Sequence, residues 1–128
     1  MLKIGKAPFL ECSSKGDKRF SAFYAVVNGK SIEDQYQAAK VFSDGSTNLS
    51  WRQAKGKWAI NMDTVRKLYS DLWNQYLNEH PELVRELSNY GGFTDMFGKS
   101  GNACQAEEVF KYKQRLNRFE RSSLDILI

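Results

Sequence analysis

Residues 20–31 read FSAFYAVVNGKS and carry the strongest local signal for the fold of this chain. The run 20–28 is aromatic and β-branched, which favours a strand. The Asn28-Gly29 pair that follows is typical of a tight hairpin turn. We therefore expect a β-hairpin here, with a short second strand at Lys30 and Ser31.

Helical signals follow the hairpin along the rest of the chain. Ser31 can cap a helix with Asp34 three residues on, and Ser50 with Gln53 can open a second, shorter helix. Apolar residues recur every three or four positions from about Asp63 to His80, which predicts an amphipathic, core-facing helix. Further helices are expected from Pro81 to about Asn89 and from about Cys104 to Arg118, with a long glycine-bearing loop over 90–103 between them. The expected fold class is α+β, a mostly helical single domain with a small β-hairpin or sheet.

The length and composition of the chain limit the number of domains and the kinds of site that it can contain. The chain of 128 residues and 14.7 kDa suits one domain, 1–128, with an N-terminal extension at 1–18 and a C-terminal tail at 119–128 that docks as a short strand or frays. Two Cys and one His exclude a Cys/His zinc site built by one chain, and we expect no metal and no cofactor. A nucleophilic pair of Cys104 and His80 competes with a simpler interpretation, a buried thiol and a surface histidine.

The net charge and the hydropathy pattern limit the kinds of partner that we expect for the chain. The net charge of +4 suits a phosphate-bearing ligand or nucleic acid without proving either. No apolar run is long enough for a signal peptide or a membrane span. We therefore expect a cytoplasmic protein that does not contact a membrane.

The best candidate for chemistry lies at the start of the helix that follows the hairpin. Glu33, Gln37 and Lys40 are spaced at i, i+4 and i+7, so they share one helix face. A carboxylate in the first turn lies near the positive end of the helix dipole, which favours its ionised form. The alternative is that Glu33 only caps the helix or is solvated.

A second candidate is Asp95, in the sequence FTDMFG. With Phe93 and Phe97 beside it and Gly98 shaping the backbone, this carboxylate could meet a sugar hydroxyl or orient a water molecule. The alternative is an Asx turn, in which the side chain caps its own backbone.

Two lysines and two tryptophans form a weaker set of candidates. Lys55 and Lys57 could hold phosphate, although a solvated face explains them equally well. Trp51 and Trp58 could stack on a base, but seven residues apart on a helix they would more simply share one packed face.

Taken in order, short motifs along the chain resemble the NADAR superfamily (the NAD- and ADP-ribose-associated, YbiA-like proteins). The similarity spans about residues 20–118. The motifs that carry it are FSAFY at 20–24, Asn28-Gly29, IEDQYQAAK at 32–40, AKGK at 54–57, HPEL at 80–83, DMFG at 95–98 and GN at 101–102. The chain departs from the family where Ala22, Asp34 and Phe97 replace Asn, His and Trp, and where a hairpin near 89–93 is shortened. It looks like a compact, divergent member, of the sort carried by a phage or a mobile element.

The resemblance implies an N-glycosidase that hydrolyses a ribosyl C–N bond in a nucleotide or ADP-ribose-type substrate, such as ADP-ribosylated guanine in nucleic acid. It implies a charge-stabilising or base role for Glu33, with Gln37 orienting water or sugar and Asp95 contacting ribose or assisting the leaving base. The substrate-binding residues that it implies are Phe20, Ser21, Phe23, Tyr24, Lys40, Lys55, Lys57, Phe97, Gly98 and Asn102.

Two other functions stay open at this stage. The missing Trp and the shortened hairpin favour a module that binds a nucleotide or ADP-ribose derivative without turnover. The charge of +4 and the many aromatic residues favour a nucleic-acid-binding protein. The sequence carries no signal for the oligomeric state.

Overall fold

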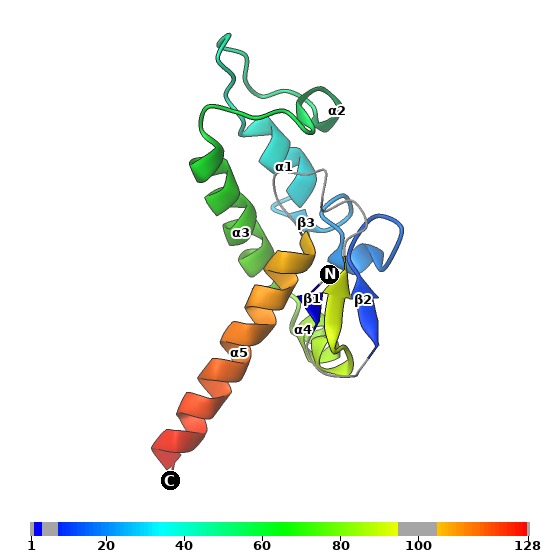
Figure 1. Ribbon diagram of the computed structural model, residues 1–128, viewed down its shortest axis with the longest axis vertical. Helices are drawn as coiled ribbons and strands as arrows, with labels where there is room; N and C mark the ends of the chain where they lie inside the picture. The colour runs from blue at the N-terminus through cyan, green and yellow to red at the C-terminus, as the bar shows by residue number, and fades with distance from the viewer. Residues whose placement is uncertain (1, 4–7, 95–104, 128) are drawn as a thin grey trace.

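Helices form most of the fold, and a small sheet lies against one of them (Figure 1). The computed structural model describes residues 2–3, 8–94 and 105–127, with side chains described in 8–94 and 105–116. The α-helices are α1 (Ile32–Ala38), α2 (Trp51–Ala54), α3 (Met62–Asn78), α4 (Pro81–Glu86) and α5 (Gln105–Leu127). Two 3-10 helices, η1 (Lys18–Phe20) and η2 (Leu87–Asn89), and five strands, β1 (Leu2–Lys3), β2 (Phe9–Glu11), β3 (Val26–Val27), β4 (Lys30–Ser31) and β5 (Gly92–Thr94), complete the described elements. The expected α+β, mostly helical class is confirmed.

The larger sheet joins distant parts of the sequence. Its strand order is β1-β5-β2, with β5 antiparallel to β1 and parallel to β2. We expected only a loop over 90–103, but Gly92–Thr94 is the central strand of this sheet. The segment 1–18, which we expected to be an extension, supplies both of the strands that pair with it.

The expected strand over 20–28 is wrong for most of its length. Residue 20 ends η1, and the backbone N–H groups of Tyr24 and Ala25 then donate to the Ser21 carbonyl at 3.0 and 2.8 Å, so the chain turns here. Residues 20–22 are all buried in succession, whereas a half-buried strand alternates its faces. Only the end of the expected hairpin forms, with β3 and β4 joined through Asn28 (φ 55°) and Gly29 (φ 85°).

The helix starts agree with their predicted caps. The Ser31 hydroxyl accepts the Asp34 N–H at 3.1 Å, and Ser50 and Gln53 form a complete capping box. The long amphipathic helix is confirmed as α3, and Pro81 begins α4. The last helix, expected to end near Arg118, continues to Leu127, so residues 119–127 of the expected tail are helical.

The α2 helix is shorter than the tryptophan spacing suggested. It ends at Ala54, and Gly56 follows with a φ of 76°, which places Trp58 outside the helix. Trp51 and Trp58 therefore do not share a packed helix face, and that interpretation is wrong.

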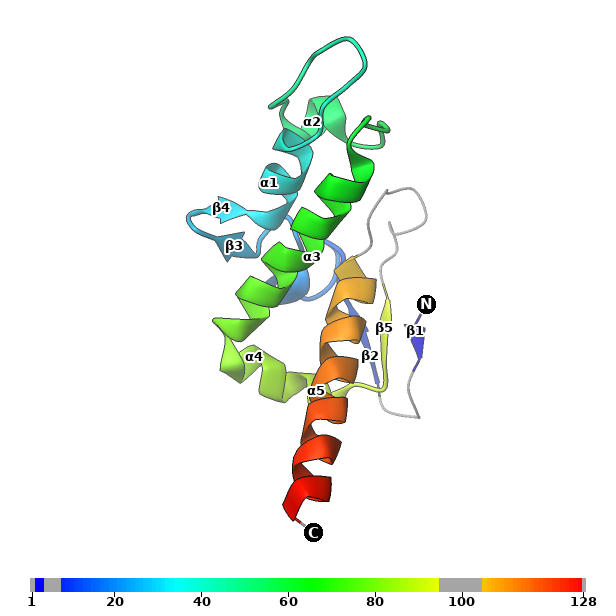
Figure 2. The same cartoon turned by 90° about the vertical axis from the view of Figure 1, so that its left-hand side faces the viewer.

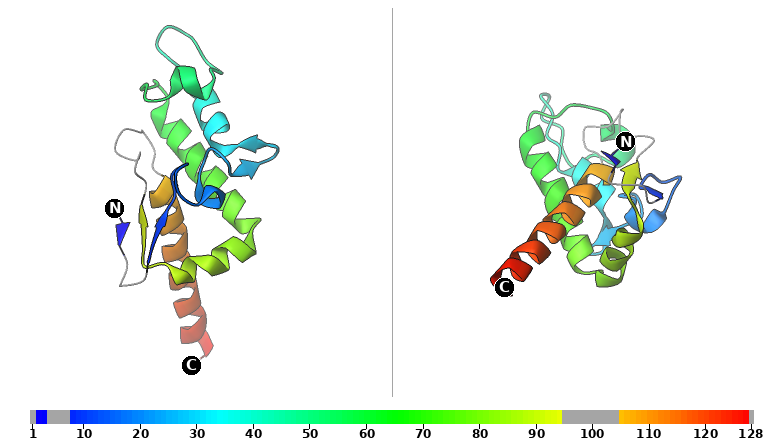
Figure 3. Two further views of the ribbon diagram at one scale, coloured as in Figure 1. Left: turned by 90° about the vertical axis from the view of Figure 1, so that its right-hand side faces the viewer. Right: turned by 60° about the horizontal axis from the view of Figure 1, so that its bottom comes forward.

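The core lies between α3, α1 and the sheet. Trp73 and Val65 of α3 are fully buried, and Tyr69 meets Tyr36 of α1 edge to face at 4.9 Å between ring centroids. Helix α5 runs beside α3 and covers one face of the larger sheet, with Phe93 of β5 against Phe110 of α5 (Figures 2 and 3). No described helix has the length and apolarity that crossing a membrane requires.

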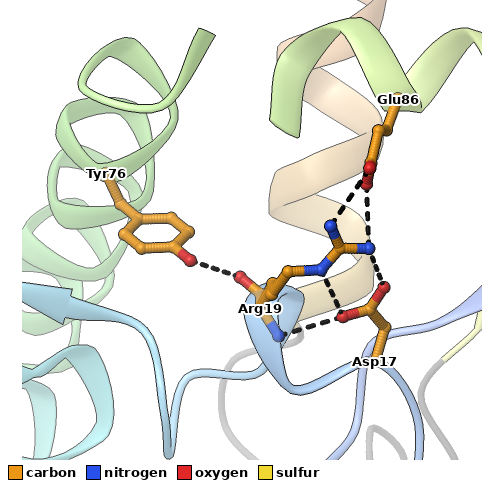
Figure 4. Close-up of polar contacts among 4 residues, drawn as sticks. All are labelled: Asp17, Arg19, Tyr76 and Glu86. Carbon is orange, nitrogen blue, oxygen red and sulfur yellow. Dashed lines mark hydrogen bonds and ion pairs between the residues drawn. The ribbon is translucent and has the colours of Figure 1, made fainter. Parts of the chain in front are cut away.

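A polar cluster anchors η1 to two helices (Figure 4). The Tyr76 hydroxyl of α3 donates to the Arg19 carbonyl at 2.6 Å. The Arg19 guanidinium pairs with Asp17 at 2.7 Å and with Glu86 of α4 at 2.8 Å. Because η1 leads directly into residue 21, this cluster fixes the entry of the 21–25 turn that meets α1.

Candidate active site

A buried carboxylate lies in the first turn of α1. The Glu33 side chain is only 8% exposed, and its Oε1 accepts a hydrogen bond from Gln37 Nε2 at 2.8 Å. The cap of α1 is the Ser31 hydroxyl, so the alternative in which Glu33 caps the helix or is solvated is wrong. The Glu33 backbone N–H donates to the Ala22 carbonyl at 2.9 Å, which ties this turn of helix to the 21–25 segment.

The protonation of Glu33 is set by opposing effects. Burial raises the pKa of the Glu33 carboxyl above its usual value, because the charged form loses its hydration. The hydrogen bond from Gln37 and the charges of Lys55 and Lys40 oppose this shift without cancelling it. A carboxyl group held in this way can exchange a proton closer to neutral pH than an exposed glutamate.

Lys40 is also buried, but α1 ends at Ala38, so the expected helix face shared by Glu33 and Gln37 does not extend to Lys40. It is 1% exposed, and its Nζ donates to the main-chain carbonyls of Ala54 at 3.1 Å and Lys57 at 3.0 Å. Burial lowers the pKa of the Lys40 ammonium, and the nearby charge of Glu33 acts against that shift. The structure therefore places Lys40 where it fastens the segment after α2, not at a surface that a phosphate can reach.

Three buried polar atoms on α1 and at the start of the 21–25 turn have no hydrogen-bond partner within the described part of the chain. They are Ser21 Oγ, Tyr36 Oη and Gln37 Oε1. Burial and the charge of Glu33 raise the pKa of Tyr36 to about 12, so its phenol is protonated at neutral pH. Buried polar groups are almost always satisfied, and a group of unsatisfied ones suits water or a polar ligand.

An aromatic wall with a cation stands beside the carboxylate. Phe23 and Trp51 meet edge to face at 5.2 Å, and Lys55 Nζ lies 5.5 and 5.7 Å from their ring centroids. Among charged groups, Lys55 contributes most to lowering the pKa of Glu33. Aromatic rings next to a cation suit the stacking of a planar base and the binding of a phosphate.

The remaining candidates lie elsewhere. Phe20 is fully buried in the core, and Tyr24 is 50% exposed with Lys18 Nζ 4.9 Å from its ring centroid. The Lys57 side chain is exposed. The His80 ring packs on Tyr76 at the end of α3. Outside the described residues lie Asp95, Phe97, Gly98, Asn102 and Cys104.

Sequence reasoning missed a residue that closes the site from a distant element. Gln105, at the start of α5, is 5% exposed, and its Oε1 accepts the Ala22 N–H at 2.6 Å. The two residues are 83 positions apart, so no local spacing could reveal this contact. The buried Tyr36 hydroxyl, which has no hydrogen-bond partner among the described residues, was missed as well.

A hollow of about 720 Å³ lies on the face of α1 opposite Glu33. Its lining includes Asp34, Gln35, Ala38 and the segment 48–50. The Gln35 amide there is engaged with the Val27 and Lys30 carbonyls at 2.8 and 3.0 Å. The buried ionisable groups of α1 face away from this hollow, so the Glu33 side is the better candidate for chemistry.

Neither a metal-binding cluster among the described residues nor a similar known protein identifies the function of this site. Among the described residues, no three His, Cys, Asp or Glu side chains are grouped closely enough to hold a metal ion. In comparison with known proteins, no family model, curated protein or solved structure matches the chain significantly.

Proposed function

We propose that the chain is an N-glycosidase with a NADAR-type fold, hydrolysing a ribosyl C–N bond in a nucleotide or an ADP-ribose-type substrate. One observation carries the proposal: the buried Glu33 carboxyl is bonded to Gln37, whose Oε1 is buried and, among the described residues, has no hydrogen-bond partner. The NADAR resemblance supplies the substrate class.

The residues fit the demands of this reaction. Breaking a ribosyl C–N bond builds positive charge on the sugar, and a carboxylate beside the anomeric carbon stabilises that charge or takes a proton from the attacking water. Glu33 has this role in the proposal. The unpartnered Gln37 Oε1 orients the water or a sugar hydroxyl. Phe23 and Trp51 provide a wall for the leaving base, and Lys55 provides a cation for phosphate.

A binding module without turnover is the second candidate, and one observation favours it. Glu33 is 8% exposed and already accepts the Gln37 amide, so the pair could hold a ligand hydroxyl without promoting attack by water. Both functions use the same ligand class and the same residues.

The first test is a chromatography and mass assay for released base or ribose product. The substrates are ADP-ribosylated guanine DNA, ADP-ribose, NAD and a riboflavin-precursor nucleotide. We expect Glu33→Gln to lower kcat/KM by at least about 100-fold, because it removes the charge that the transition state needs.

Asp34→Asn is the matched control, since Asp34 is the next residue in the same helical turn and is exposed. It should keep wild-type activity. Full activity in Glu33→Gln would overturn the mechanism. Absence of product from every substrate, with binding retained in calorimetry, would select the binding module.

A further inference from the structure

The two most exposed large apolar side chains among the described residues, Trp58 and Ile60, follow α2 in the sequence. Trp58 is 63% exposed and Ile60 is 69% exposed. The Arg66 guanidinium lies 4.6 Å from the Trp58 ring centroid, which leaves more than half of this side chain open to solvent. Large exposed rings that carry a cation are a common mark of a binding surface.

Trp51, which precedes Trp58 by seven residues, also has basic side chains next to its ring. Arg52 lies 5.3 Å and Lys55 Nζ 5.7 Å from the Trp51 ring centroid. Residues 51–66 contain four basic residues and one acidic residue, a net charge of +3. The segment that carries these rings is therefore positively charged.

The segment is held in one shape. Lys40 Nζ binds the Ala54 and Lys57 carbonyls, and the Ile60 N–H donates to the Val41 carbonyl at 2.8 Å. Helix α2 lies at the end of the molecule opposite the last turn of α5, away from the sheet (Figures 1 and 2). A ligand can bind here without displacing the core.

We infer that residues 51–58, together with Arg66, form a binding surface for single-stranded nucleic acid. Unpaired bases stack on exposed indole rings whatever their sequence, and the interleaved Lys and Arg side chains neutralise the phosphates between them. An acidic peptide would use the cations but would leave Trp58 without a planar partner. A duplex hides its base faces, so it also leaves the ring unused.

The surface meets the candidate active site at Lys55, which contacts both Phe23 and Trp51. The inference goes beyond the proposed N-glycosidase, because strand binding is measurable without turnover. Trp58 and Arg66 have no role in the proposed N-glycosidase, so changing them tests strand binding separately from turnover.

The test is fluorescence anisotropy with a short labelled oligothymidylate at low salt. We expect wild-type protein to bind it, and Trp58→Ala to weaken binding about tenfold or more through loss of one stacked base. Trp58→Phe keeps a ring and should retain most of the affinity. Arg66→Gln should weaken binding and reduce the slope of log K against log salt by about 0.7, the value for one phosphate contact on a single strand.

Two control variants remove a ring and a cation elsewhere on the protein. Phe9→Ala removes a ring that is 45% exposed on β2, and Lys111→Gln removes a lysine from α5. Both should bind like wild type, and melting curves should show that every variant is folded. The inference is overturned if wild type does not bind, if Trp58→Ala binds as well as Phe9→Ala, or if duplex DNA or polyglutamate binds as tightly as the single strand.

Discussion

Glu33 and Asp34 are adjacent acidic residues in the first turn of α1, yet they meet opposite surroundings. One helical step rotates the side chain by about 100°, so Glu33 shares a face with Gln37 while Asp34 is exposed. The helix dipole favours both negative charges, but only Glu33 loses its hydration. Keeping Glu33 ionised in this buried position therefore lowers the stability of the fold, as is often the case for residues that take part in chemistry.

Neutralising Glu33 should stabilise the protein near neutral pH. The folded-state pKa of Glu33 is raised by burial, so its contribution to stability is full below the unfolded pKa and is lost as pH rises through the folded pKa. We expect Glu33→Gln to melt higher than wild type at neutral pH, by about 2–4 °C, and the difference to shrink on acidification. Asp34→Asn should melt close to wild type at both pH values. A lower melting temperature for Glu33→Gln at neutral pH would contradict the prediction.

Helix α2 has four residues, too few for a helix to be stable alone. Its start is fixed by the Ser50–Gln53 capping box, and its end by the ammonium of Lys40, which follows α1. Asn61 adds to this anchoring, since it binds the Val41 N–H and the Ala39 carbonyl at 2.9 and 3.0 Å. The position of α2, and of both proposed binding surfaces, thus depends on residues 39–41, which follow α1.

Lys40→Met should loosen the segment after α2. The change removes two hydrogen bonds from a charged donor and leaves two carbonyls without it, which we expect to cost about 1–3 kcal/mol. Hydrogen exchange should quicken around residues 54–58, and the melting temperature should fall. Lys67→Met is the control, because the exposed Lys67–Asp71 pair contributes little. Unchanged exchange in Lys40→Met would show that the cost of burying the ammonium offsets its bonds.

Local signals explain which elements the sequence predicts correctly. The caps at Ser31 and Ser50, the stripe of α3 and the proline start of α4 each depend on residues a few positions apart, and each is confirmed. Strand β5 was missed because its partners lie near the start of the chain. The Glu33–Gln37 contact follows from helical spacing, whereas the burial of Glu33 and the contact of Gln105 with Ala22 depend on tertiary packing.

Residues near the start of the chain complete the larger sheet and pack into the core. Leu10 of β2 is 3% exposed, and the Cys12 N–H donates to the Thr94 carbonyl at 2.7 Å. Helix α5 packs on the other side of β5 through Phe110 and brings Gln105 to the 21–25 turn beside Glu33. The sheet therefore supports the candidate site although it supplies none of the catalytic candidates described.

Leu10 and Phe9 are neighbours on β2, and substituting each of them tests whether this strand is part of the folded core or only an extension of the chain. Leu10→Ala should lower the free energy of unfolding by about 2–4 kcal/mol, because it leaves a cavity beside β5. Phe9 is 45% exposed on the same strand, so Phe9→Ala should cost less than about 1 kcal/mol. Urea titration followed by tryptophan fluorescence measures both values. Equal, small losses would mean that β2 is an appendage, and the support that it gives to α5 and the Glu33 site would then have to come from α3 alone.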